Sequence, residues 1–229
     1  INASGTQPTW VLPLMRAARG LALVQAVEGM LRSGADENRT LMEQMIGQTV
    51  IASDSPLRTA AARNLQTNLE RMLADVKAAG VQALVCTTAS NESGLAPLGE
   101  DDQGGLDAAG QAEVARLAAA PPAAGAVDAL RAAAARAPGS ARTQFALARS
   151  LQASGDAAGA RQAFLRARDL DTMPWRPTSQ TEQAIRDAAA GQGAVLCDVA
   201  ARFRDLSPEG ATGWELLDDH VHPSLHGQA

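Results

Sequence analysis

Two short apolar runs, each following a helix pattern and a glycine, constrain the fold of this chain most strongly. The first, residues 81–86, follows an amphipathic pattern that begins at Pro56 and ends at Gly80. The second, residues 194–198, follows a helix pattern over residues 181–190. Nearly continuous apolar runs of this length are typical of strands buried on both faces of a parallel sheet. The two helix-to-strand units predict an open α/β fold with both strands in one sheet, where ligands bind outside the carboxyl ends of the strands.

The cysteines and two of the tryptophans are expected in the protein core. Cys86 and Cys197 lie inside the two apolar runs, so we predict buried thiols rather than a disulfide framework. Trp175 and Trp214 follow the alanine-rich middle of the chain and precede its histidine-rich end. Core packing is the default expectation for such large aromatic side chains.

The middle of the chain, residues 106–171, is alanine-rich and has no strand pattern. Ala160, Phe164 and Ala167 reproduce part of the spacing of a tetratricopeptide repeat, and small or apolar residues also occupy the three positions one repeat length earlier. We therefore predict one clear and one degenerate helical repeat, which must pack against the α/β part. An alanine-rich helical hairpin with accidental spacing is the alternative.

Composition excludes several classes of function. A net charge of −5 and a pI near 5.2 argue against a nucleic-acid surface, because binding to phosphates needs clustered Lys and Arg. The absence of Tyr excludes a tyrosine base or nucleophile. The longest apolar stretch, residues 21–31, is interrupted by Gln25 and Glu28 and cannot span a bilayer.

The chemistry is concentrated near residue 220, where residues 216–228 contain all three histidines. Asp219 and His222 have D-x-x-H spacing, which places the carboxylate within reach of one ring nitrogen of the histidine. Such a carboxylate fixes the tautomer of the imidazole and leaves the other nitrogen free to take a proton from a nucleophile. A serine from elsewhere in the fold would have to supply that nucleophile.

The run DHVHP at residues 219–223, followed by Gly227, resembles the last motif of the SGNH (GDSL-type) hydrolases. Residues 56–98, with VQALVCTTASN, and residues 166–189, followed by VLCDVAARF and GWELLDDHVHP, are similar to the variant of that family with a tetratricopeptide insertion. The resemblance covers most of residues 56–229 and lies more in the order of its parts than in any single motif.

The resemblance implies a flavodoxin-like, three-layer parallel sheet, here incomplete. Residues 1–105 and 176–229 would form two parts of the α/β domain, and residues 106–175 would be the helical insertion. It also implies a serine esterase that acts on a small ester or an acylated substrate and requires neither a cofactor nor a metal. His222 would be its general base and Asp219 would orient it.

Other motifs of the family are missing or altered. No Gly-Asp-Ser motif is present, so we interpret the sequence as a fragment that lacks the first strand and the nucleophile. INASG at residues 1–5 resembles the second block, with Gly5 as the candidate donor to the oxyanion hole. Asn38 is the only nearby asparagine where the third block is expected. Asn91 follows the strand at 81–86 and is either a turn residue or a wall of the substrate pocket.

Two other interpretations of the histidine segment remain open. His220, His222 and His226 with Asp218 and Asp219 could form a metal cluster, in which His220 and His222 would converge on one point. Alternatively, Asp219 could cap the following turn through backbone amides while His222 points to solvent. The hydrolase interpretation requires Asp219 within about 2.6–3.2 Å of His222, with His220 not sharing the carboxylate. It also requires the free ring nitrogen of His222 to face a cleft bounded by Gly5 and the loop after Cys86. His226 is expected to point to solvent.

Two functions follow from these interpretations. The first is an SGNH-type esterase, in which the sequence as given is expected to show no ester hydrolysis above a His222→Ala control. Labelling by a serine-directed phosphonate would overturn that expectation and identify Ser4 as the nucleophile. The second is a catalytically decayed module that binds a protein partner through its helical repeats.

Overall fold

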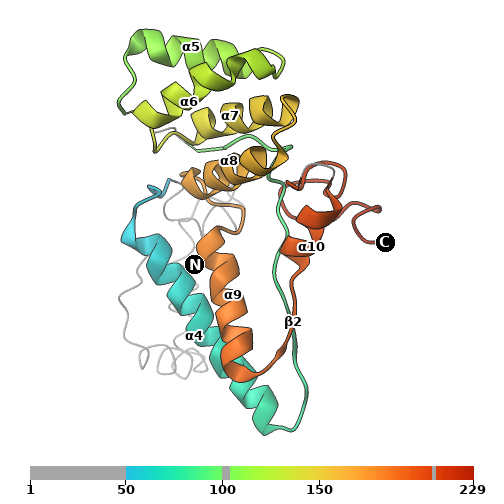
Figure 1. Cartoon of the computed structure of the whole chain (residues 1–229). Helices are drawn as coiled ribbons and strands as arrows, with labels where there is room; N and C mark the ends of the chain where they lie inside the picture. Colours follow the sequence, from blue (N-terminus) through green and yellow to red (C-terminus); the bar gives the residue numbers. More distant parts are fainter. Residues whose placement is uncertain (1–49, 100–103, 208–209) are drawn as a thin grey trace, which may run out of the picture. The chain divides into compact units, whose positions relative to one another are not determined.

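The computed structural model describes residues 50–99, 104–207 and 210–229, which belong to one compact unit that begins at Val50 (Figure 1). Within these residues the chain forms seven α-helices, one 3-10 helix and two strands. In chain order the elements are α4 (Pro56–Ala78), β1 (Leu84–Cys86), α5 (Ala108–Ala119), η1 (Ala124–Ala126), α6 (Val127–Arg136), α7 (Ala141–Ala153), α8 (Ala157–Leu170), α9 (Ser179–Gln192), β2 (Val195–Cys197) and α10 (Val199–Leu206).

The two predicted strands pair as expected, in one parallel sheet. Leu84 lies opposite Val195, and Cys86 lies opposite Cys197. Each strand follows a helix that ends at or just before a glycine in the left-handed region, Gly80 before β1 and Gly193 before β2. Glycine tolerates this backbone conformation without steric cost, so the chain can turn from each helix into its strand.

The predicted three-layer, flavodoxin-like sheet is wrong for the part of the chain that the structure describes. That part is mostly helical, and its sheet contains only β1 and β2. Val85 packs with Leu73 of α4 and Ile185 of α9, so the two helices cover one face of the strands. Successive strand residues point to opposite faces, and Leu84 on the other face is 65% exposed. A three-layer fold would cover this second face, and no described helix does so.

The expectation that Cys86 and Cys197 are buried thiols is also wrong, because both are exposed. Their apolar surroundings in the sequence predicted burial, but only one side of the sheet is covered. Trp175 and Trp214 likewise do not pack in the core, since they are 50% and 52% exposed. Partial desolvation of the Cys86 thiol, together with the neighbouring Cys197, still raises the pKa of Cys86.

Helices α5 to α8 form a consecutive stack between β1 and α9 in the chain, in which α5 contacts α6, α6 contacts α7, and α7 contacts α8 (Figure 1). Its core contains Leu130 and Phe164, both with no exposed surface, and Phe164 meets Phe145 edge to face at 5.4 Å between ring centroids. Alanines at the crossings allow the helices to approach closely. Helical structure through residues 108–170 therefore agrees with the absence of a strand pattern there.

Local sequence signals explain where several helices begin. The Ser55 hydroxyl accepts from the amide of Leu57 ahead of α4, whose first residue is Pro56, and proline is favoured at this position because its missing N–H would have no partner there. Asp107 and Asp156 cap α5 and α8 in the same way, by accepting from backbone amides three residues later. None of the described helices is both long and apolar enough to cross a membrane.

Candidate functional site

The D-x-x-H segment forms a closed loop at residues 216–224. Leu217 and Pro223 form an antiparallel bridge, and the amide of Ser224 donates to the carbonyl of Leu216 at 2.9 Å. Leu216 and Leu217 are buried against Phe203 of α10 and Ala89, which follows β1. Gly227 closes the segment, because a Cβ at this position would lie 2.1 Å from the carbonyl oxygen of Leu216. The loop is therefore anchored by buried leucines before its polar tip and by backbone contacts after it.

Asp219 binds the backbone and the ring of the residues that follow it. Its Oδ1 accepts from the amides of Val221 and His222 at 2.8 and 2.7 Å, and its Oδ2 lies 2.6 Å from Nδ1 of His222. The amides of His222 and Val221, followed by the His222 ring, hold the pKa of the Asp219 carboxyl well below its usual range. The carboxylate therefore both caps the turn and orients the imidazole, which combines two of the interpretations that the sequence left open.

The surroundings of His222 are open and partly aromatic. Its side chain is 75% exposed. Nδ1 of His220 lies 3.6 Å from Oδ1 of Asp219, which is longer than a hydrogen bond, so the carboxylate bonds to His222 rather than to His220. The centroid of the His220 ring lies 5.9 Å from that of the Trp175 ring and 6.1 Å from that of the His222 ring. His226 is exposed, as expected from the sequence.

Asn91, in the loop after β1, is fully buried and contacts the D-x-x-H segment. Its Nδ2 donates to the carbonyl of Asp219 at 3.2 Å, and its backbone amide donates to the carbonyl of His220 at 2.9 Å. Its Oδ1 accepts from the amide of Gly94 at 2.9 Å. The Asn91 side chain, for which the sequence left open a place in the wall of the substrate pocket, thus forms its hydrogen bonds with other parts of the protein.

A buried ion pair supports this loop from the end of α8. Nη1 of Arg176 donates to the carbonyls of Asn91 and Leu95, both at 2.8 Å, while its Nη2 lies 3.1 Å from Oδ2 of Asp171. Asp171 also accepts from the amides of Leu98 and Gly99. Arg176 is 4% exposed and Asp171 is 2% exposed. The helical stack is therefore joined to the loop that contacts the dyad by charged groups that are almost fully buried.

A second buried cluster joins four charged side chains, which we call the Arg–Glu cluster: Arg168 of α8, Glu182 of α9, Arg204 of α10 and Glu92 of the loop after β1. Each side chain is at most 6% exposed, and Glu182 accepts from both arginines. Burial by itself would raise the pKa of Glu182, but hydrogen bonds from Arg204 and the charges of both arginines outweigh it and lower the pKa. The sequence reasoning missed this cluster, because its members lie far apart in the chain.

The carboxylate of Asp198, at the end of β2, also joins separate parts of the fold. Asp198 accepts from the hydroxyl of Thr87 at 2.8 Å and from Nε of Arg186 at 2.7 Å, and it caps α10 through the amide of Ala201. The hydrogen bond from Arg186 is the main reason that the pKa of Asp198 falls to about 2. The ends of both strands are thus tied to each other and to α9.

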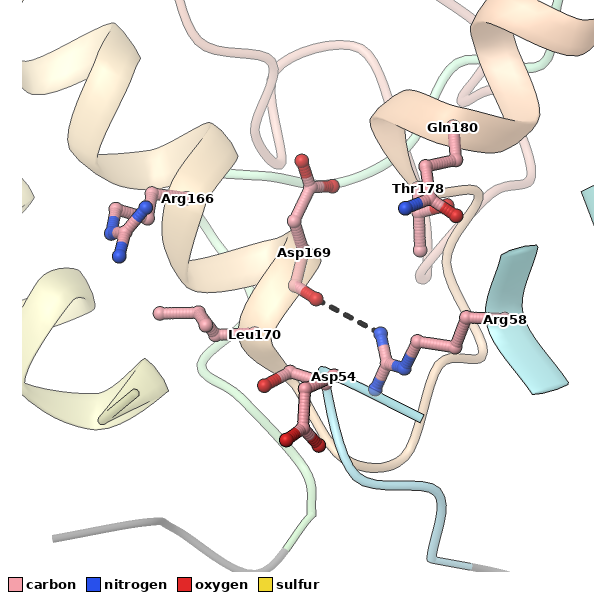
Figure 2. Close-up of a pocket in the computed structure, with 8 residues that line it drawn as sticks. Asp54, Arg58, Arg166, Asp169, Leu170, Thr178 and Gln180 are labelled. Carbon is pink, nitrogen blue, oxygen red and sulfur yellow. Dashed lines mark hydrogen bonds between the residues drawn. The ribbon is translucent and has the colours of Figure 1, made fainter. Parts of the chain in front are cut away.

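A pocket of about 260 Å³ lies away from the dyad, between the start of α4, the end of α8 and the start of α9 (Figure 2). Arg58, one of two arginines that line it, donates to the carbonyls of Ile51, Ala52, Asp169 and Asp171. Burial is the main cause of the lowered pKa of this guanidinium. Because all of these contacts are to backbone oxygens, Arg58 joins the backbone segments around the pocket. Its guanidinium group is therefore not free to bind a ligand there.

Several candidate residues from the sequence lie outside the described residues, namely Ser4, Gly5 and Asn38. Nothing in the structure therefore bears on the oxyanion hole proposed for Gly5. Among the residues that are described, no group of three or more His, Cys, Asp or Glu side chains is placed to hold a metal ion. Comparison of the chain with protein-family models, with curated proteins and with solved structures finds no match.

Proposed function

We propose that the chain carries the acid–base dyad of an SGNH-type ester hydrolase, with His222 as the general base and Asp219 as the carboxylate that orients it. The contact of 2.6 Å between Oδ2 of Asp219 and Nδ1 of His222 carries this proposal. A carboxylate in this position holds the proton on Nδ1 and stabilises the imidazolium that forms during proton transfer. The resemblance of residues 219–223 and Gly227 to the last motif of that family supports it.

The exposure of His222 suits an incoming substrate. Nε2 takes the proton of a serine hydroxyl while its Oγ bonds to the carbonyl carbon of an ester. The tetrahedral intermediate then expels the alcohol, which receives the same proton from Nε2. Water then attacks the acyl-enzyme by the same two steps, with Nε2 taking and returning the proton, which gives the carboxylic acid and the free serine. Small esters or acylated substrates fit this chemistry, and none of these steps requires a cofactor.

The structure places no nucleophile against His222 among the described residues. Among those residues no hydroxyl is hydrogen-bonded to the ring of His222, whose polar partner is Asp219. Ser4, next to the candidate oxyanion donor Gly5, is the candidate within this sequence. Its role is tested by labelling the chain with a fluorophosphonate, which reacts with an activated serine.

The test of the function uses the product of the complete open reading frame and p-nitrophenyl acetate. We expect His222→Ala to lower kcat/KM by about 10³-fold or more, and Asp219→Asn to lower kcat strongly because it no longer selects the Nδ1–H tautomer. His226→Ala is the matched control, since it removes an exposed imidazole four residues away and should leave the rate unchanged. A rate that does not depend on His222, with no phosphonate labelling, would refute the proposal.

A second candidate function is a module that binds a protein partner through α5–α8. The observation in its favour is that these helices form a continuous stack while the described residues supply no nucleophile to His222. The same assay separates the two functions. Hydrolysis that depends on His222 identifies an enzyme, whereas its absence leaves the interaction module as the better explanation.

A further inference from the structure

We propose that Asn91 is the positioning residue of the Asp219–His222 dyad and that Arg176 holds Asn91 in this role, an inference that rests on the proposed hydrolase function. Asn91 reaches both residues at the start of the D-x-x-H motif. Its Nδ2 bonds to the carbonyl of Asp219, and its backbone amide bonds to the carbonyl of His220. The two contacts join the loop after β1 to a segment 128 residues later in the chain.

His222 depends on such support because the protein holds its ring at few points. The side chain is 75% exposed, and its one described hydrogen bond is to Asp219. The orientation of the imidazole therefore follows the position of the carboxylate. That position depends in turn on the backbone of residues 219–222, because Oδ1 of Asp219 is fixed by the amides of Val221 and His222. A contact that fixes this backbone therefore also fixes the direction in which Nε2 of His222 points.

Asn91 is itself held in place by burial and by hydrogen bonds from Gly94 and Arg176. It has no exposed surface, its Oδ1 accepts from Gly94, and its carbonyl accepts from Arg176. Gly94 also leaves no room for movement, because a Cβ there would lie 2.6 Å from the Trp214 ring and 2.7 Å from Oδ1 of Asn91. Arg176 is paired with the buried Asp171. A side chain fixed in this way can transmit its geometry to the dyad, and buried polar groups hold it in one rotamer.

The chemistry of the contacts gives Asn91 a different role from that of a substrate-binding asparagine. A donor to an oxyanion must point into the site with its N–H groups free. Nδ2 of Asn91 instead donates to a protein carbonyl, and the residue is fully buried. The side chain therefore acts through Asp219 and does not touch the substrate.

Asn91→Asp tests this role because it keeps the size of the side chain and the acceptor for Gly94 while replacing the donor to Asp219. Asn68→Asp is the matched control, since it makes the same change at an exposed position of α4. Long-range proton–nitrogen NMR spectra report the tautomer of the neutral His222 ring. We expect mainly the Nδ1–H tautomer in the unchanged protein and in Asn68→Asp, and at least a twofold loss of it in Asn91→Asp.

The kinetic readout gives an independent measure. If the proposed hydrolase function holds, Asn91→Asp should lower kcat about 10²-fold with KM unchanged, because a displaced general base slows proton transfer without removing substrate contacts. Unchanged tautomer and unchanged kcat in a folded Asn91→Asp protein would overturn the inference. If the unchanged protein shows no His222-dependent hydrolysis, the proposed function fails, and the tautomer measurement still decides whether Asn91 positions the ring.

Hydrogen exchange in the unchanged protein keeps the inference testable where Asn91→Asp does not fold. The amide of Asn91, bonded to His220, and the amides of Val221 and His222, bonded to Asp219, should then have protection factors within about tenfold of one another, because they open as one unit. Much faster exchange at Val221 and His222 than at Asn91 would show that the motif moves independently, which would overturn the inference.

Discussion

Replacing Glu182 by Gln should destabilise the protein by about 3–5 kcal/mol, the cost of leaving a buried charge without its partner. The Arg–Glu cluster contains two arginines and two glutamates. Glu182 is 3% exposed and contacts both arginines of the cluster. The substituted side chain would retain one oxygen acceptor but no charge. Arg204 would then keep only Glu92 within the cluster, and Arg168 would keep Glu92 and the partly exposed Asp169.

The measurement is urea unfolding followed by far-ultraviolet circular dichroism, with the free energy of unfolding obtained by linear extrapolation. The matched control is Glu113→Gln, which breaks an exposed pair with Arg116 on α5 and should cost no more than about 0.5 kcal/mol. A loss in Glu182→Gln of less than about 1 kcal/mol, or equal to that of the control, would refute the argument that the cluster is charge-balanced in a dry interior.

A double-mutant cycle checks the cause of the effect. Glu182→Gln with Arg204→Gln removes one charge of each sign from the cluster and leaves Arg168 paired with Glu92, 2.9 Å away, and with Asp169. The loss in the double variant should therefore be smaller than the sum of the two single losses by about 1 kcal/mol or more. Additive losses would show that packing, rather than charge balance, determines the cost.

Three further predictions concern other parts of the molecule. Ser90 has a buried hydroxyl without a hydrogen-bond partner among the described residues, so Ser90→Ala should raise the free energy of unfolding by about 1 kcal/mol, and a loss measured in urea would contradict this. Phe164→Ala should lower the free energy of unfolding by about 3–5 kcal/mol in the same assay, because the ring is fully buried. Asp198 has a folded pKa of about 2, below its usual 3.8, so its stabilising effect is present above pH 3.8 and is lost as the pH falls toward 2. Stability measured between pH 4 and pH 2 should therefore fall less steeply in Asp198→Asn, whose amide does not titrate; equal slopes would rule out this contribution.

Features that depend on neighbouring residues could be predicted from the sequence. The start of α4 at Pro56 and the end of the helices near Gly80 and Gly193 follow from backbone preferences. The contact between Asp219 and His222 also follows from local spacing, because the two residues are three positions apart in the chain. The parallel pairing of β1 with β2 could be predicted as well, since both strands show the same helix-to-strand pattern.

Burial and the partners of polar groups were decided only by the tertiary structure. The same apolar run around Cys86 is compatible with a strand covered on two faces or on one, and the packing of α4 and α9 on a single face left the thiol exposed. Asn91 has the sequence context of a turn residue, yet its side-chain amide donates to the carbonyl of Asp219, 128 residues away. Likewise, Arg168 meets Glu92 across 76 residues. Local preferences act over a few residues, whereas a buried polar group is satisfied by whatever the folded chain brings to it, so the partners of Asn91 and Arg168 were set by the packing of the whole unit.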